Sequence, residues 1–72
     1  MNQALGLAVR ELRRQRGMSQ EELAQASGLH PTYISGIERG LRNPTWRSIG
    51  RVCKALDVKL SELAARAERL EP

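Results

Sequence analysis

The chain has 72 residues and a formal net charge of +4, and it contains one cysteine and no phenylalanine. A chain of this length forms one small domain, and a single cysteine excludes a disulfide framework and any cysteine-based zinc or iron–sulfur site. Its core must therefore come from leucine, isoleucine, valine and alanine, which favours close packing of helices, and we expect an all-α fold.

The first two helices are predicted from apolar spacing and from residues typical of helix ends. An amphipathic helix ends near Gly17, which suits the C-terminal cap position. Ser19 followed by Glu22 forms a capping box, which predicts a short second helix that buries Leu23 and stops at Gly28. The apolar residues that recur at helical spacing in the first helix are Leu5, Ala8, Val9 and Leu12.

Three further helices are predicted in the remaining chain. Pro31 suits the first turn of a helix and Gly40 its exit, which gives a third helix over about 31–39. Thr45 can cap a fourth helix, and Trp46 at its start is expected to pack in the core or at its rim. The apolar stripe of the fourth helix is Ile49, Val52, Cys53 and Leu56, and that of the fifth is Leu60, Leu63, Ala64, Ala67 and Leu70.

The free face of the third helix has an unusual composition. Ile34 and Ile37 define its apolar side, and at about 100° per residue the opposite side is small, polar and basic. Glycine inside a helix costs about 1 kcal/mol relative to alanine, so a glycine here calls for the close approach of another surface, or for packing against another helix. The residues on this opposite side are Thr32, Ser35, Gly36 and Arg39.

The positive charge is local. Ten of the twelve basic residues are arginine, the side chain best shaped for phosphates and base edges. Residues 37–56 carry a net charge of +4, whereas residues 57–72 carry −1. This distribution indicates nucleic acid as a partner.

No apolar run approaches the ~20 residues that span a bilayer, so we expect no association with a membrane. The N-terminal basic residues follow the apolar ones, which is the reverse of a signal peptide. We therefore expect a cytoplasmic, nucleoid-associated location.

The run SQEELAQASGLHPTYISGIERGLRNP resembles the signature of the Cro and phage-repressor class of helix-turn-helix proteins, also called the XRE family. TYISGIERG with the following RN is similar to the controller proteins of restriction-modification systems. The resemblance covers nearly the whole chain. It implies a compact five-helix, phage repressor-like DNA-binding domain over residues 1–72, with the helix-turn-helix at about 19–39.

The resemblance also implies the roles of individual residues. The glutamine at the start of the second helix bonds a phosphate, the front of the third helix meets base edges in the major groove, and the following loop contacts the DNA backbone. Pro31 and Gly36 depart from the arginine or glutamine that relatives often carry there. For each residue the alternative is a solvated or locally packed side chain. The residues expected to bind DNA are Gln20, Pro31, Thr32, Tyr33, Ser35, Gly36, Arg39, Arg42 and Asn43.

Further residues are assigned structural roles. By resemblance Glu38, which the helical spacing places beside the core, pairs with Arg13 of the first helix. His30 is interpreted as a surface cap or a phosphate neighbour, and we expect no metal site. A homodimer is expected, since most soluble oligomers are closed dimers. Its interface is predicted at Leu60, Leu63 and Ala67, with the alternative that these belong to the core of one chain.

These observations predict a sequence-specific regulator of transcription that binds double-stranded DNA, either a repressor or an autoregulator at a palindromic operator. A protein-interaction or antitoxin-like module that keeps the fold is the alternative, because few side chains at the front of the third helix can discriminate bases. An enzyme is not expected, since no carboxylate pair, phosphate loop, metal cluster or nucleophile with its base is found. No cofactor and no small-molecule effector are expected.

Overall fold

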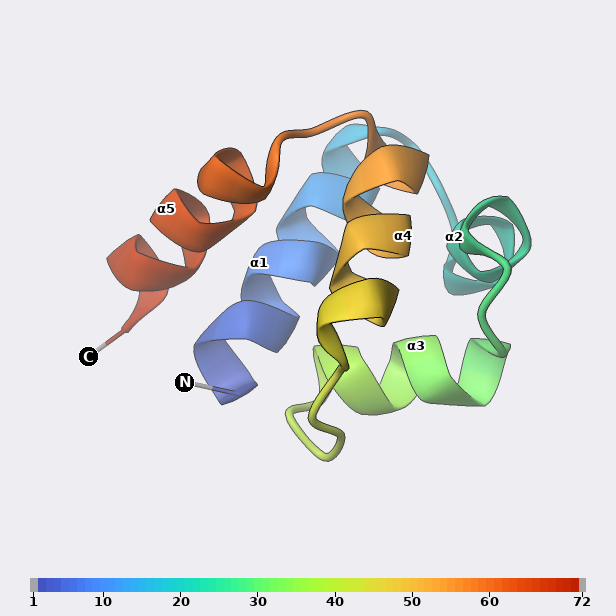
Figure 1. Cartoon of the computed structure of the whole chain (residues 1–72), viewed down its shortest axis with the longest axis horizontal. Coiled ribbons are helices and arrows are strands. Elements are labelled where there is room, and N and C mark those ends of the chain that lie inside the picture. Colours follow the sequence, from blue (N-terminus) through green and yellow to red (C-terminus); the bar gives the residue numbers. More distant parts are fainter. Residues whose placement is uncertain (1, 72) are drawn as a thin grey trace.

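The computed structural model describes residues 2–71, and the regular structure among them consists of five α-helices. Figure 1 shows α1 and α4 in the centre of the molecule, α5 on one side, and α2 and α3 on the other. The five-helix, all-α prediction is confirmed. The bounds are Asn2–Gln15 for α1, Gln20–Ser27 for α2, Pro31–Glu38 for α3, Trp46–Leu56 for α4 and Leu60–Leu70 for α5.

The helix ends follow the capping chemistry predicted from the sequence. Ser19 Oγ accepts a hydrogen bond from the Glu22 N–H at 3.0 Å, and the Glu22 carboxylate accepts from the Ser19 N–H at 2.8 Å. Thr45 Oγ1 accepts from the Ser48 N–H at 3.0 Å at the start of α4. Gly28, at the end of α2, has φ 73°, a conformation that favours glycine. Local sequence therefore determines where these helices begin and end.

The core is aliphatic and draws on all five helices. Its largest fully buried side chains come from α2, α3, α4 and α5, while α1 contributes Ala8, Val9 and Leu12. Cys53 is buried among them, and burial raises the pKa of its thiol, which suits a neutral space-filling role. The largest fully buried side chains are Leu23, Ile34, Leu56, Leu63 and Val52.

Close approach and ion pairs hold the outer helices on α1. A Cβ on Gly6 would collide with the backbone of α3, at 2.6 Å from the Glu38 carbonyl oxygen, so α1 and α3 touch where α1 has no side chain. On α5, Arg66 donates to the Glu11 carboxylate of α1 at 3.0 Å. Arg16 Nε donates to the Leu56 carbonyl at 2.8 Å and so provides a partner for a carbonyl group at the C-terminal end of α4.

Within residues 2–71, no helix has both the length and the apolar composition needed to cross a membrane.

Two sequence-based expectations about packing are wrong. Trp46 lies neither in the core nor at its rim, because its side chain is 77% exposed at the first turn of α4. Leu63 and Ala67 are 1% and 3% exposed, so they belong to the core of one chain and cannot form the predicted dimer interface. The buried part of the α5 stripe packs against α1 and α4, while Leu60 and Ala64 remain exposed. Of the three predicted interface residues, only Leu60 remains exposed.

Candidate nucleic-acid interface

The helices α2 and α3 are joined by residues 28–30, and α3 starts at the surface. His30 caps α3, with Nδ1 accepting a hydrogen bond from the Thr32 N–H at 3.1 Å. Pro31 follows at the first position of the helix, where its missing N–H leaves no gap in the hydrogen-bond ladder. Pro31 and Thr32 are both exposed. The front of α3 is therefore a capped and accessible helix start.

The two faces of α3 differ sharply in burial. Ile34 and Ile37 are 0% and 2% exposed and fix α3 to the core. Thr32 and Arg39 on the other side are exposed, and Ser35 is half-buried. The loop after α3 exposes Arg42 and Asn43. The surface of α3 thus carries small hydroxyl side chains with basic residues at its C-terminal end.

Gly36 does not lie on the open part of this face, as the helical spacing had suggested. It is buried, and a Cβ at this position would lie 2.5 Å from Cγ of Arg42. The Leu41 and Arg42 N–H groups both donate to the Gly36 carbonyl, at 2.9 and 3.2 Å, so the chain turns back over the end of α3. The surface that approaches Gly36 is the stem of Arg42, and a direct contact between Gly36 and a base is not favoured.

Tyr33 connects α3 to the loop before α4. It is half-buried, and its hydroxyl oxygen accepts from the Thr45 N–H at 3.4 Å. The Arg42 guanidinium carbon lies 6.0 Å from the centre of the Tyr33 ring, at the outer limit of a cation–π contact. Tyr33 therefore orders the loop and limits the positions open to Arg42.

Glu38 is the centre of a buried polar network at the end of α3. Arg13 donates to both carboxylate oxygens, from Nε at 2.6 Å and from Nη2 at 3.0 Å. Gln20 Nε2 donates to Oε1 at 2.9 Å, and Arg10 Nε lies 3.5 Å from the same oxygen. Burial acts to raise the pKa of Glu38, but the hydrogen bonds from Arg13, Gln20 and Arg10 outweigh it, and the pKa is below its ordinary value. Hydrogen bonding to Glu38 in turn raises the pKa of Arg13.

The network gives Gln20 a partner that the sequence did not indicate. Its amide nitrogen bonds Glu38 while the residue stays partly exposed at the start of α2. A phosphate contact by the remaining atoms of Gln20 is still a prediction. Because Arg13, Gln20 and Glu38 come from α1, α2 and α3, the network fixes the helix-turn-helix to the first helix.

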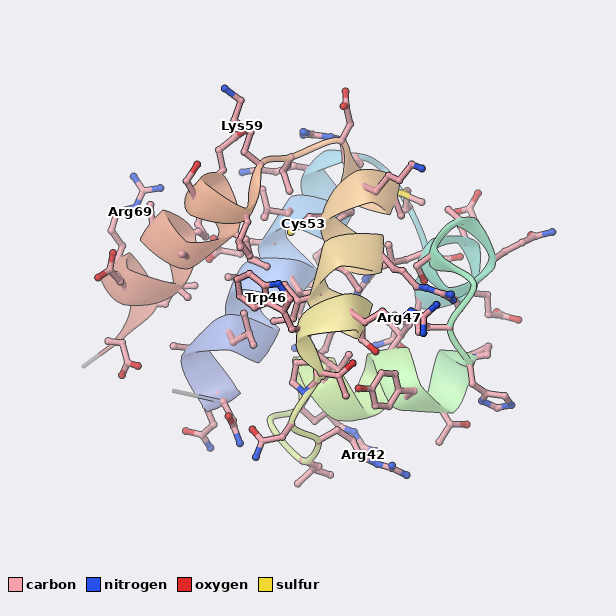
Figure 2. All side chains as sticks on the ribbon, viewed as in Figure 1. Arg42, Trp46, Arg47, Cys53, Lys59 and Arg69 are labelled. Atoms are coloured by element: carbon pink, nitrogen blue, oxygen red, sulfur yellow. The ribbon has the colours of Figure 1, made fainter. Side chains whose placement is uncertain are left out.

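Two arginines of α4 join this surface, although the sequence had suggested only their contribution to local charge. The Arg51 guanidinium lies over the turn between α2 and α3, with Nη1 3.3 Å from a Cβ placed on Gly28. Figure 2 shows Arg47 extending from α4 toward α2. Their spacing of four residues places them on one face of α4, a signal that the sequence does contain. Within residues 2–71, no group of three or more His, Cys, Asp or Glu side chains could hold a metal ion.

The short helices α2 and α3 are joined by a three-residue turn, and one face of α3 is exposed. This arrangement is a helix-turn-helix. The chain belongs to the helix-turn-helix family, whose model matches residues 9–63. The control protein C.BamHI of Bacillus amyloliquefaciens is 48% identical over 59 residues, which cover 81% of this chain and 73% of that protein.

Solved structures agree with this assignment. The restriction-modification controller protein C.AhdI from Aeromonas hydrophila has a TM-score of 0.83 and 44% identity, over 85% of this chain and 92% of that one. The controller protein C.Esp1396I, solved as a tetramer with its natural 35 base-pair operator, has a TM-score of 0.86 and 35% identity, over 94% and 90% of the two chains. The resemblance to the XRE family and its controller branch is confirmed.

Proposed function

We propose that this protein is a regulator of transcription that binds double-stranded DNA sequence-specifically, with α3 in the major groove. It acts as a homodimer at a roughly palindromic operator and represses or autoregulates a promoter by occupying it. The observation that carries the proposal is the surface of α3, where Thr32 and Ser35 lie between exposed arginines. Because Thr32 and Ser35 have short side chains, the helix can approach base edges closely enough for their hydroxyl groups to reach them. The arginines can bond the flanking phosphates.

The arginines at both ends of α3 support contacts with the DNA backbone on both sides of the helix. Arg39 and Arg42 lie at the C-terminal end of α3, and Arg51 lies over the turn that precedes it. Phosphate contacts of this kind position a protein on the duplex, while base contacts determine sequence preference. One α3 spans only part of a helical turn, so a second copy is needed to contact two half-sites about one turn apart.

A binding selection on random duplexes, performed with the purified full chain, tests the proposal. The expected result is enrichment of a two-fold symmetric site whose half-sites are separated by about 10 base pairs or a multiple of a turn. A sizing measurement on the selected complex should give an even number of protomers. Recovery of unenriched DNA would contradict sequence-specific binding and would favour the protein-interaction alternative.

A further inference from the structure

A surface hollow of about 400 Å³ lies between α1 and the C-terminal end of α3. Its α1 wall is made of residues spaced by four and three positions, which places them on one face of that helix. We call this feature the α1–α3 hollow. A ligand in it would contact side chains of α1 and of the end of α3 together. The residues that line the hollow are Gln3, Leu7, Arg10, Glu38 and Arg39.

The carboxylate that borders the hollow is already neutralised. The Glu38 side chain is fully buried, and Arg13 donates to both of its oxygens. Gln20 donates to one of the same oxygens. Because the charge of Arg13 balances that of Glu38, the carboxylate adds no net negative charge to the hollow.

The two arginines of the hollow have donors to spare. Arg10 Nε lies 3.5 Å from Glu38 Oε1, the longest contact of the buried network, and the Arg10 side chain is 33% exposed. Within residues 2–71, the two terminal nitrogens of Arg10 have no hydrogen-bond partner, and the guanidinium of Arg39 has none. Arginine stays charged at any pH at which this fold is expected to persist. The hollow therefore offers two positive charges with open donors to a ligand.

These donors favour a phosphate group. A carboxylate presents two oxygens in one plane, whereas a tetrahedral phosphate can accept from donors that approach from different helices, and arginine often bonds it through two nitrogens. Gln3 adds an exposed side-chain amide to the two guanidinium groups. Leu7, which is 42% exposed, places an apolar side chain beside these donors. A phosphate joined to a sugar, whose ring carbons can contact a leucine, suits this combination.

The hollow adjoins the side of α3 that we propose binds DNA. Arg39 lines the hollow and is also exposed on the same side of α3 as Thr32. Figure 1 shows the N-terminal end of α1 and the C-terminal end of α3 at the same edge of the molecule. With α3 in the major groove, the sugar–phosphate strands that border the groove pass beside the ends of the helix.

We infer that the α1–α3 hollow is a phosphate-binding site, which a phosphate of the DNA backbone occupies when α3 lies in the major groove. Arg10 and Arg39 bond the phosphate oxygens, Gln3 adds a donor, and Leu7 contacts the neighbouring deoxyribose. The inference rests on the proposed function and extends it, because it makes α1 part of the DNA-binding surface. Phosphate contacts of this kind fix the position of the protein on the duplex.

Substitution of Arg10 tests the site with a matched control. Arg10→Ala should bind the selected duplex about tenfold more weakly, with the same enriched sequence, and should reduce the salt slope by about one for each protomer. Arg10→Lys restores the charge and should restore the slope. Arg69→Ala removes an exposed arginine from α5, on the side of the molecule away from α2 and α3, and should bind like the wild type.

A second variant leaves the buried network intact. Gln3 is exposed in the first turn of α1, where an acidic side chain favours the helix. Gln3→Glu should therefore keep the wild-type melting temperature while it weakens DNA binding by repelling the phosphate. Arg10→Ala removes only the longest contact of the network, so its melting temperature should change far less than that of Glu38→Gln. Wild-type affinity of both Arg10→Ala and Gln3→Glu would overturn the inference.

Neutralising single phosphates of the duplex identifies the group in the hollow. Each backbone phosphate of the selected site is replaced in turn by an uncharged methylphosphonate. In each half-site, one replacement should weaken binding of the wild type about tenfold and should have no further effect on Arg10→Ala, because both changes remove one interaction. If every replacement weakens the wild type and Arg10→Ala equally, no phosphate contacts Arg10 and the inference is wrong.

Titration with inorganic phosphate separates this inference from the proposed function. The side-chain N–H resonances of Arg10 and Arg39 should shift and saturate together, while that of Arg69 should not. If the wild type selects no duplex but these shifts occur, the proposed function fails, and the hollow is a site for a free phosphate compound. Equal shifts of all three arginines would mean that the hollow is no phosphate site. If the wild type selects a symmetric duplex but no phosphate is coupled to Arg10, the inference fails alone.

Discussion

Gly36 lies directly beneath the side chain of Arg42, since a Cβ on Gly36 would be 2.5 Å from Arg42 Cγ. The two residues are also joined through the backbone, where the Arg42 N–H donates to the Gly36 carbonyl at 3.2 Å. The missing side chain of the helix thus provides the space that an arginine of the following loop occupies. Arg42 is held against α3, next to the face that we propose binds DNA.

This relationship predicts that Gly36→Ala and Arg42→Ala have the same effect on DNA binding. An alanine methyl at position 36 must displace the Arg42 stem near its root, so each variant should lose about tenfold in affinity, as expected for one contact of about 1–3 kcal/mol. Equilibrium titration of the selected duplex measures this loss. The double variant should bind no more weakly than Arg42→Ala, because both changes remove one interaction. Wild-type affinity of Gly36→Ala would contradict the prediction.

Alanine substitution should have opposite effects on the free energy of unfolding at Gly6 and at Gly50. At Gly6 the new methyl collides with rigid carbonyl groups of α3, so Gly6→Ala should lower the free energy of unfolding by about 1–3 kcal/mol or more. At Gly50 the methyl meets open space, so Gly50→Ala should raise it by up to about 1 kcal/mol through helix propensity. Urea unfolding monitored by circular dichroism, at a concentration where the protein is monomeric, measures both. Equal effects would show that α1 and α3 are not in close contact.

Glu38→Gln should destabilise the protein in a pH-dependent way. At neutral pH the change leaves the Arg13 guanidinium without its counter-ion, and a loss of about 3–5 kcal/mol is expected for a broken buried pair. The pKa of Glu38 is lowered in the folded state. Its stabilising contribution is therefore complete above the unfolded pKa of about 4.3 and is lost as the pH falls through the folded value.

The measurement is a series of urea unfolding curves for the wild type and Glu38→Gln. The difference in stability should be constant from about pH 7 to pH 5 and should shrink below about pH 4. Taking the difference cancels the titration of the other carboxylates. A difference that stays constant into the acid range would mean that Glu38 carries no pH-dependent stability.

Substitutions on α3 should change the sequence preference of the protein, whereas a substitution at Gln20 on α2 should change its overall affinity for DNA. Thr32→Ala or Ser35→Ala should change the enriched site in a random-duplex selection, because these side chains lie on the exposed face of α3. Gln20→Ala should weaken binding to all sites similarly. It should also lower the melting temperature, because Gln20 bonds the buried Glu38 carboxylate. An unchanged site for both α3 variants would remove α3 as the source of specificity.

Affinity for the operator should fall steeply with salt. Each protomer places four arginines around the helix-turn-helix, at positions 39, 42, 47 and 51. If two protomers neutralise about six or more phosphates, affinity should drop about a thousandfold between 50 and 200 mM salt through counterion release. Titrations at several salt concentrations give the slope, and Arg51→Ala should reduce it by about one for each protomer. A flat response would contradict phosphate-dominated binding.

Features that depend on neighbours along the chain were predictable. The capping box at Ser19 and Glu22, the cap at Thr45 and the exit at Gly28 are set by short-range hydrogen bonds and backbone freedom, and the structure contains each of them. The spacing of Ile34 and Ile37 likewise fixed the inward side of α3. Membership of the helix-turn-helix family could be inferred because these local signals occur together at fixed spacing.

What covers each face was decided only by tertiary structure. Periodicity identifies an apolar or a bare side of a helix, but it cannot say which distant residue lies against it. Trp46 looked like a core residue, although its turn of α4 faces solvent. Gly36 looked open, although the stem of Arg42 covers it. Gly6 gave no signal, because its role comes from a helix that begins 25 positions later. Contacts between distant residues depend on how the helices pack, and they determine which side chains remain on the surface of the molecule.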